Sequence, residues 1–296
     1  MSPPGSPNGY RGRFAPTPSG PLHFGSLVAA LASYQRARAA RGVWLLRIDD
    51  LDPPRVAPGA SDAILRALEA FGMHWDAPVI YQSQRTAHYA AALETLAAAG
   101  LIYGCRCSRR AIADRAQEGV DGPIYPGTCR ALGFDFSAAA ARVKTQPGSI
   151  AFDDLAQGSV KQNLAEDIGD FVLRRADGVY SYQLANVVDD AEFDITEVVR
   201  GADLLASTPR QIYLQQLLGY ARPAYCHVPV VCNEHGEKLS KQTRATALDL
   251  TQPLRQLCAA ARFLGFGVGQ VSDYDNVDNF WDWIASQSLE TALSVR

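Results

Sequence analysis

The sequence predicts an α/β protein built on a doubly wound parallel sheet. Short apolar runs that suit buried strands alternate with segments of helical periodicity through the first hundred residues. The clearest strand, residues 43–48, ends in a run of carboxylates, and open parallel sheets bind their ligands at the carboxyl ends of strands. A chain of 296 residues is long enough for one large domain or two, with an ample core.

Composition restricts the class of protein. Residues 1–9 are rich in Pro, Gly, Ser and Asn, without the charged and apolar regions of a signal peptide, so we expect a loose tail. No apolar run approaches the roughly 18 residues of a membrane span, which predicts no membrane partner. Six cysteines without a secretory signal favour the reducing cytoplasm. A net charge of −3 means that any RNA partner needs a local basic surface.

The first chemical signal is a strand–turn–helix over residues 13–26. A Pro- and Gly-rich turn leads into a helix with Leu27, Val28 and Leu31 on one face. A helix start after a strand is a natural anion site, since its backbone N–H groups are unpaired. Gly25 would let a phosphate approach the backbone, and His23 adds a donor. An ordinary strand–helix turn with a structural histidine is the alternative.

The strand over residues 43–48 is followed by Asp49, Asp50 and Asp52. We interpret Asp49, which follows the strand directly, as the ligand contact, and the other two as a solvated acidic turn or local caps. A helix capped by Ser61 and stopped at Gly72 comes next. A second helix spans about residues 84–99.

After residue 102 the chain carries three cysteines within 25 residues. Cys105, Cys107 and Cys129 suggest a zinc site with three thiolates, although C-x-C is tighter than the usual spacing. Tyr125 is an unusual but well-placed fourth ligand. The alternative is three small buried thiols. We interpret Cys226, Cys232 and Cys258 as core residues.

Residues 149–183 are rich in predicted strands. Residues 171–175 and 179–183 flank Asp177-Gly178, a strong hairpin signal. Residues 187–190 and 195–203 are interpreted as a return to the core sheet. Arg200 ends an apolar strand there, and such an arginine pairs either with a ligand carboxylate or, in a structural salt bridge, with Asp189, Asp190 or Asp203.

The last third of the chain begins with a helix from Thr208-Pro209, an N-cap and first-turn pair, to Gly219. A buried strand is predicted over residues 225–232. The polar loop after it carries Lys238 and Lys241, and is either a solvated turn or a loop that brings ammonium groups onto phosphates. Short helices near Pro253 and over residues 280–284 complete the chain.

Together these motifs resemble a known family. The stretch 13–20, then His23-Phe24-Gly25-Ser26, and the loop 238–242 resemble the two signatures of class I aminoacyl-tRNA synthetases of the glutamyl/glutaminyl branch. The match runs from about residue 12 to 242, and is closest to the glutamyl-queuosine tRNA(Asp) synthetases, truncated paralogues of glutamyl-tRNA synthetase. At most about fifty residues follow the lysine loop, too few for an anticodon-binding domain.

The resemblance implies domains and an activity. It implies a Rossmann-like catalytic domain in two halves, 10–102 and 186–245, an inserted α+β subdomain with a structural zinc site, 103–185, and a helical region, 246–296. The implied enzyme activates L-glutamate with ATP and Mg²⁺ without tRNA, and then esterifies queuosine in the tRNA(Asp) anticodon arm. We expect a cytoplasmic monomer. The alternatives are a small glutamyl-tRNA synthetase acting on a tRNA 3′ end and a catalytically silent RNA-binding paralogue.

The resemblance also assigns residues. Position 49 is Asp where relatives usually have Glu, which shortens the carboxylate that would hold the substrate ammonium, so that a bridging water or a small backbone shift would have to compensate. Ser26 replaces the second His of many class I signatures. Its implied catalytic residues are His23, Gly25, Lys238 and Lys241; its glutamate site is Arg13, Phe14, Ala15, Pro16, Thr17, Asp49, Tyr182 and Arg200; its ATP site is Pro18, His23, Gly25, Ser26 and Lys241; its zinc ligands are Cys105, Cys107, Tyr125 and Cys129.

Overall fold

A parallel sheet forms the centre of the computed structural model, which describes residues 9–120, 122–232 and 246–294. β1 (Arg11–Phe14) pairs in parallel with β2 (Val43–Ile48), and β2 pairs with β3 (Ile80–Tyr81). On the other side of β1 lies β11 (Glu197–Gly201), joined through Thr196, whose N–H donates to the Arg11 carbonyl at 2.9 Å. β11 pairs in parallel with β12 (Ala224–Val228). The strand–helix alternation of the sequence therefore predicted the sheet correctly.

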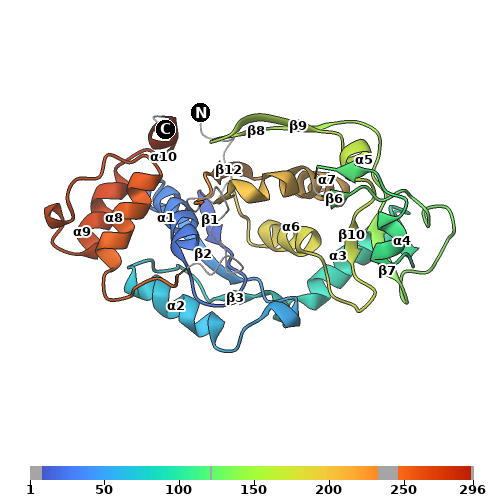
Figure 1. Cartoon of the computed structure of the whole chain (residues 1–296), viewed down its shortest axis with the longest axis horizontal. Helices are drawn as coiled ribbons and strands as arrows, with labels where there is room; N and C mark the ends of the chain where they lie inside the picture. Colours follow the sequence, from blue (N-terminus) through green and yellow to red (C-terminus); the bar gives the residue numbers. More distant parts are fainter. Residues whose placement is uncertain (1–8, 121, 233–245, 295–296) are drawn as a thin grey trace.

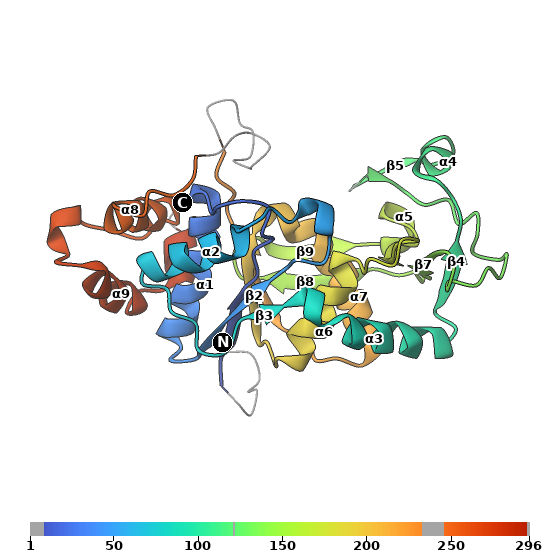
Figure 2. The same ribbon diagram turned by 90° about the horizontal axis from the view of Figure 1, so that it is seen from below.

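Helices cover this sheet on both faces (Figures 1 and 2). α1 runs directly from the turn after β1, buries Leu27, Val28 and Leu31, and packs on β1 and β11. Its N-cap is His23, whose Nδ1 accepts the Ser26 N–H. The helices around the sheet are α1 (Phe24–Ala39), α2 (Ala60–Ala70), α3 (Thr86–Ala98), α6 (Tyr182–Glu192) and α7 (Thr208–Leu218), with 3₁₀ turns η1 (Pro53–Arg55), η2 (Gln82–Gln84) and η3 (Ala202–Ser207).

A small antiparallel sheet lies beyond α3, at the far end of the molecule from the C-terminal helices (Figure 2). Its strand order is β10-β7-β4. The hairpin β8–β9 departs from this unit, because Asp154 of β8 pairs with Tyr225 of β12 and so extends the central sheet. The elements are β4 (Ile102–Cys105), α4 (Arg109–Ala113), β5 (Glu118–Gly119), β6 (Gly122–Pro123), β7 (Ala140–Val143), β8 (Ile150–Asp154), β9 (Gly158–Gln162), α5 (Leu164–Asp167) and β10 (Val172–Arg174).

The chain ends in helices that pack against α1 (Figure 1). Phe280, Trp281 and Ile284 enter the same core as the α1 side chains, and the Trp281 indole N–H donates to the Phe71 carbonyl at 2.9 Å. Pro253 begins the first of these helices, as predicted. They are α8 (Pro253–Phe263), η4 (Val271–Asp273), α9 (Val277–Ala285) and α10 (Leu289–Ser294). None of the described helices is long and apolar enough to cross a membrane.

Several local predictions differ from the structure. Residues 187–190 lie in α6, not in a strand, since Val187 and Val188 face one core while Asp189 and Asp190 are buried in an ion-pair network. Gly59, in a left-handed conformation, is the N-cap of α2, and Ser61 lies inside the helix.

The predicted hairpin around Asp177-Gly178 does turn the chain back, through the Arg174–Tyr180 bridge, but its second arm ends at once because Ser181 caps α6. The strand predicted over 225–232 ends at Val228, and Cys232, which was predicted to be a core residue, lies beyond that end and is exposed.

Candidate active site

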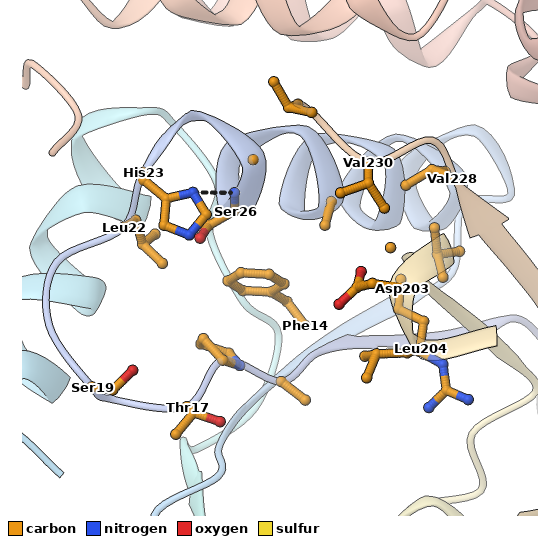
Figure 3. A pocket seen from close by; sticks show the side chains of 18 of the residues that line it. Phe14, Thr17, Ser19, Leu22, His23, Ser26, Asp203, Leu204, Val228 and Val230 are labelled. Atoms are coloured by element: carbon orange, nitrogen blue, oxygen red, sulfur yellow. Dashed lines mark hydrogen bonds between the residues drawn. The ribbon is translucent and has the colours of Figure 1, made fainter. Parts of the chain in front are cut away.

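The carboxyl ends of β1, β11 and β12 open into a cavity of about 660 Å³ (Figure 3). The turn after β1 and the start of α1 form one wall, and the segment after β12 forms another. Such a position, at the strand ends beside a helix N-terminus, is where open α/β sheets bind nucleotides. The predicted site residues that line the cavity are Arg13, Phe14, Ala15, Pro16, Thr17, His23, Gly25, Ser26, Tyr182 and Arg200.

Two predicted residues lie away from the cavity, and two others are not described by the structure. Pro18 and Asp49 do not line the cavity. Lys238 and Lys241 lie outside the described residues. The ends of that segment are nonetheless placed by the structure: Val231 lines the cavity, and Ala247 forms an isolated antiparallel bridge with His23.

His23 is oriented by its capping role. Since Nδ1 accepts the Ser26 N–H at 3.3 Å, the proton of the neutral ring lies on Nε2 (Figure 3). The first turn of α1 and the His23 ring therefore lie at the same end of the cavity, an arrangement that suits an anion. Gly25, in the first turn of α1, also lines the cavity and adds no side chain there.

Arg13 and Asp49 belong to a buried ion-pair network behind the cavity. The Arg13 guanidinium donates to both Asp190 oxygens, at 3.1 and 3.2 Å. Arg47 donates to Asp190 at 2.8 Å and to Asp49 at 2.7 Å. Burial raises the pKa of Asp49 to about 6, although Arg47 opposes the shift. Burial also acts to raise the pKa of Asp190, but Arg13 and Arg47 outweigh it and lower that pKa.

Arg200 has a different environment, because its partners are all neutral groups. It is 5% exposed. Its Nη1 donates to the Tyr182 hydroxyl at 3.0 Å, its Nη2 to Thr208 and Gln211 at 2.8 Å each, and its Nε to His227 at 3.0 Å. Among the described residues no carboxylate forms a salt bridge with it, which excludes the structural pairing with Asp189, Asp190 or Asp203.

Sequence reasoning missed the residues that support the two arginines. Arg47 and Asp190 hold Arg13, while His227 and Asp154 lie behind Arg200. Asp203, also missed, lines the cavity directly. A polar residue inside an apolar strand was the available signal for Arg47 and His227, since such a side chain is buried and needs partners.

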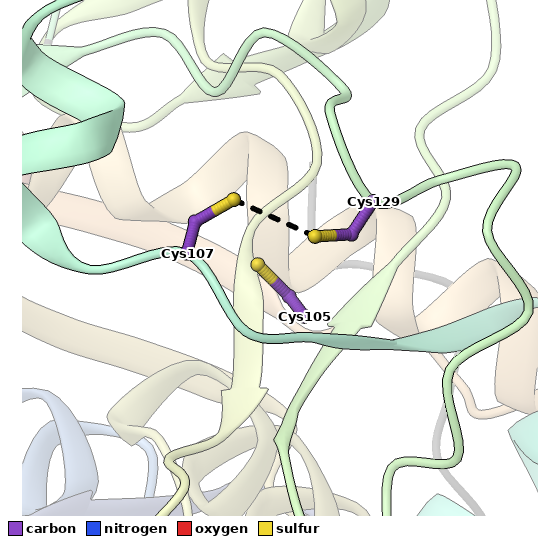
Figure 4. Close-up of side chains that lie close together, drawn as sticks. All are labelled: Cys105, Cys107 and Cys129. Atoms are coloured by element: carbon purple, nitrogen blue, oxygen red, sulfur yellow. Dashed lines mark hydrogen bonds between the residues drawn. The ribbon is translucent and has the colours of Figure 1, made fainter.

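The three predicted cysteines do come together (Figure 4). The Sγ atoms of Cys105, Cys107 and Cys129 all lie within 4.8 Å of one another. The Tyr125 hydroxyl lies 3.3 Å from the Cys105 Sγ and 3.6 Å from the Cys107 Sγ. Burial acts to raise the pKa of Cys129, but hydrogen bonds from Tyr125 and the Arg106 backbone lower it to about 7. Three thiols and one phenol converging on a point match the four-donor number of structural metal sites.

The fold and the cavity define the class of protein. The model for tRNA synthetases class I (E and Q), catalytic domain, matches residues 10–256. The structure also resembles the crystal structure of a glutamate tRNA ligase from Elizabethkingia meningosepticum in complex with its amino acid, with a TM-score of 0.78 and 24% identity, over 95% of this chain. This chain spans 65% of that one, and the likeness concerns the fold alone.

Curated relatives narrow the class. A glutamyl-Q tRNA(Asp) synthetase of Dechloromonas aromatica is 57% identical over 277 residues, 93% of this chain and 92% of the relative. One from Chromobacterium violaceum is 53% identical over 282 residues, 95% of this chain and 94% of the relative. The chain therefore belongs to the glutamyl-Q tRNA(Asp) synthetase family, and it is an ATP-dependent enzyme of the ligase type.

Proposed function

We propose that this chain activates L-glutamate with ATP in the absence of tRNA, and then transfers the glutamyl group to the cyclopentenediol of queuosine at the wobble position of tRNA(Asp). A glutamate carboxylate oxygen attacks the α-phosphorus, and the bond to pyrophosphate breaks. A cyclopentenediol hydroxyl then attacks the glutamyl carbonyl, and AMP leaves. The family names support this assignment. The observation that carries it is Arg200, a buried cation at a nucleotide-type cavity with only neutral partners.

The activation step needs positioning and charge neutralisation, with no protein nucleophile. We assign the ATP phosphates to the start of α1, with His23 Nε2–H and the first-turn N–H groups as donors. Lys238 and Lys241 would neutralise charge on the α-phosphate and the leaving pyrophosphate. In support, the described chain on each side of them, at Val231 and Ala247, lies at the cavity and at His23. Mg²⁺ enters with ATP.

The glutamate side chain is assigned to Arg200. Leaving a buried cation without an anion costs several kcal/mol, so an anionic ligand is strongly favoured there. The Tyr182 hydroxyl, 3.0 Å from Nη1, directs the guanidinium toward the cavity. The side-chain carboxylate of glutamate would neutralise the buried charge of Arg200, whereas the neutral amide of glutamine would not. This site should therefore select glutamate.

Arg13 and Asp49 are assigned to the other end of the amino acid. Arg13 lines the cavity while paired with Asp190, so it presents a largely neutralised cation. Asp49 is held by Arg47 and does not line the cavity. Contact of Asp49 with the substrate ammonium therefore requires a bridging water, as its short side chain suggests.

Zinc is assigned to Cys105, Cys107, Tyr125 and Cys129. The converging donors fit it, and the lowered pKa of Cys129, about 7, favours the thiolate form that binds a metal. The ion would brace the strands and loops of the inserted unit, 103–185. We place the protein in the cytoplasm as a monomer.

One assay tests the proposal against its two rivals. Glutamate-dependent ATP–pyrophosphate exchange is measured without RNA, and glutamate transfer is then measured to queuosine-containing and queuosine-lacking tRNA(Asp). Exchange without tRNA, with transfer only to the queuosine form, is expected. Transfer to both forms that is lost on blocking the 3′ end would indicate a small glutamyl-tRNA synthetase. The absence of exchange would indicate a silent RNA-binding paralogue.

A further inference from the structure

A histidine and an aspartate form a buried pair directly behind Arg200. His227, on β12, is completely buried, and Asp154, at the end of β8, is 4% exposed. The His227 Nδ1 lies 2.5 Å from Asp154 Oδ2, while its Nε2 lies 3.0 Å from Arg200 Nε. Two consecutive hydrogen bonds therefore connect the end of β8 to the cation that lines the cavity.

The hydrogen bonds around Asp154 determine which ring nitrogen carries the proton. Its Oδ1 accepts three backbone N–H groups, from Ala156, Gln157 and His227, at 2.9 to 3.0 Å. Burial acts to raise the pKa of Asp154, but its bonds with His227 lower it, so it is a carboxylate and can only accept. Burial lowers the pKa of His227, because it disfavours the charged imidazolium, so the ring is neutral. Its proton must then lie on Nδ1, and Nε2 must be an acceptor.

An acceptor at Nε2 is what Arg200 needs. Of its five N–H groups, four donate to described residues: Nε to His227, one on Nη1 to Tyr182, and two on Nη2 to Thr208 and Gln211. One Nη1 N–H is left over beside Tyr182, at the cavity. The Thr208 hydroxyl also lies 3.0 Å from Nε2. The opposite tautomer would set Nε2–H against the Arg200 Nε–H, two donors 3.0 Å apart, so that Nε would lose its acceptor and the guanidinium would be held only at Nη1 and Nη2.

We infer that Asp154 and His227 are positioning residues for substrate recognition: they impose one imidazole tautomer, which fixes the Arg200 guanidinium so that its free N–H faces the side-chain carboxylate of glutamate. The inference rests on the proposed function, and specifies how its glutamate site is assembled. Because every group that holds Arg200 is neutral, these hydrogen bonds orient the guanidinium without neutralising its charge.

Asp154→Asn is the decisive variant. It is isosteric, and its Oδ1 can keep the three backbone N–H bonds, which places the new NH₂ group where Oδ2 was. That group donates to Nδ1, so the proton of His227 must move to Nε2. We expect KM for glutamate in the exchange reaction to rise at least tenfold, with KM for ATP and the melting temperature little changed. Asp170→Asn, at a buried carboxylate of the inserted unit, is the matched control and should leave KM for glutamate unchanged.

Nitrogen-15 NMR of the imidazole rings shows which nitrogen of His227 carries the proton. A purely structural role of Asp154 would not require this position to change in Asp154→Asn. The His227 signal is identified by its loss in His227→Gln, a variant that keeps an acceptor near the Nε2 position and should retain more glutamate affinity than His227→Leu. We expect protonated Nδ1 in the wild type and protonated Nε2 in Asp154→Asn.

The outcomes separate cleanly. An unchanged KM for glutamate in Asp154→Asn, a wild-type proton on Nε2, or equal increases in both KM values together with lost stability would each overturn the positioning role. A wild-type chain without glutamate-dependent exchange would refute the proposed function itself, and this role with it, whatever the tautomer.

Discussion

Two arginines at the cavity have the same residue type and nearly the same burial, yet different electrostatic roles. Arg13 is 3% exposed and donates two hydrogen bonds to Asp190, so the carboxylate largely neutralises its charge. Arg200 is 5% exposed and bound by hydroxyl, amide and imidazole groups. Only the second leaves a net charge for a substrate. The partners, more than the arginine itself, therefore determine which one recognises an anion.

Arg200→Ala should abolish glutamate activation. Removing a buried charged partner of a substrate carboxylate costs about 2–5 kcal/mol, so kcat/KM for glutamate in pyrophosphate exchange should fall by about 30-fold to a few thousandfold. The same measurement on Arg38→Ala is the control, since Arg38 pairs with Asp76 away from the cavity. Near-wild-type exchange by a folded Arg200→Ala protein would contradict the assignment.

Asp49 should make stability depend on pH in mildly acid solution. Burial raises its pKa from 3.8 in the unfolded chain to about 6, so between these values the folded state binds the extra proton. Its contribution to stability is fully present below pH 3.8 and is lost as pH rises through 6. The loss is about 3 kcal/mol, since one pKa unit corresponds to about 1.4 kcal/mol.

Chemical denaturation of the wild type and Asp49→Asn from pH 4 to 7 measures this contribution. The free energy of unfolding of the wild type, minus that of the variant, should decrease over this range. A difference that is flat or increases would show that Arg47 keeps the pKa of Asp49 near its usual value.

Helix α6 illustrates how one element serves two environments. Its Leu184, Val187 and Val188 pack in the core shared with α3 and β10. Asp189 and Asp190, also buried, accept hydrogen bonds from α3, η2 and the first two strands. The helix thereby connects Arg13, at the cavity, to α3, the helix that precedes β4. A run of two valines and two aspartates predicts neither role on its own.

The cysteine cluster should stabilise the inserted unit, and only that unit. Cys129→Ser removes one of four converging donors, so zinc content should fall from near one equivalent toward zero, and the loops around Tyr125 should become sensitive to protease. Pyrophosphate exchange without tRNA, which uses the cavity, should change little. Cys232→Ser is the control, because Cys232 is exposed and outside the cluster. A wild-type zinc content under about a tenth of an equivalent would contradict the zinc assignment.

The molecule is organised along one line, with the C-terminal helices at one end, the central sheet in the middle and the inserted unit at the other end (Figure 2). The helices α8 and α9 cover the side of α1 that faces away from the sheet, and Gln35 of α1 donates to the carbonyls of Ile284 and Gln287. Helix α1, at whose start we propose the phosphate site, is therefore held on both sides. The C-terminal region acts as a buttress for α1.

Trp281→Ala should reveal that role. Trp281 is 8% exposed, stacks edge-to-face with Tyr34 of α1 at 4.6 Å between centroids, and bonds the Phe71 carbonyl. Its truncation should lower the free energy of unfolding by about 3–5 kcal/mol. Both KM values should be unchanged at temperatures where the protein is folded. Trp283→Ala, at a less buried position of the same helix, is the comparison and should cost less. Equal losses for both variants would argue against the buttress.

The sequence alone determined the parallel sheet, the strand–turn–helix at its first edge, the cavity residues from Arg13 to Ser26, and the convergence of three cysteines. These depend on local spacing: apolar periodicity, turn residues and short-range cysteine pairs define elements within a few tens of residues. Tertiary structure decided what the charged residues do. Asp189 and Asp190 became helical because buried partners from distant elements compensate them, and Asp49 was drawn to Arg47.

Arg200 and its supporting pair show the same division. The sequence predicted that Arg200 lies at the end of a strand. It did not decide whether Arg200 pairs with a ligand carboxylate or with a carboxylate of the protein itself. Arg200 contacts Thr208, 8 positions away, and His227, 27 positions away, and His227 in turn contacts Asp154, 73 positions away. These neutral partners of Arg200 take the place that a carboxylate would have in an internal salt bridge. Charge compensation depends on which groups are brought within about 4 Å, and folding alone brings residues so far apart in sequence to that distance.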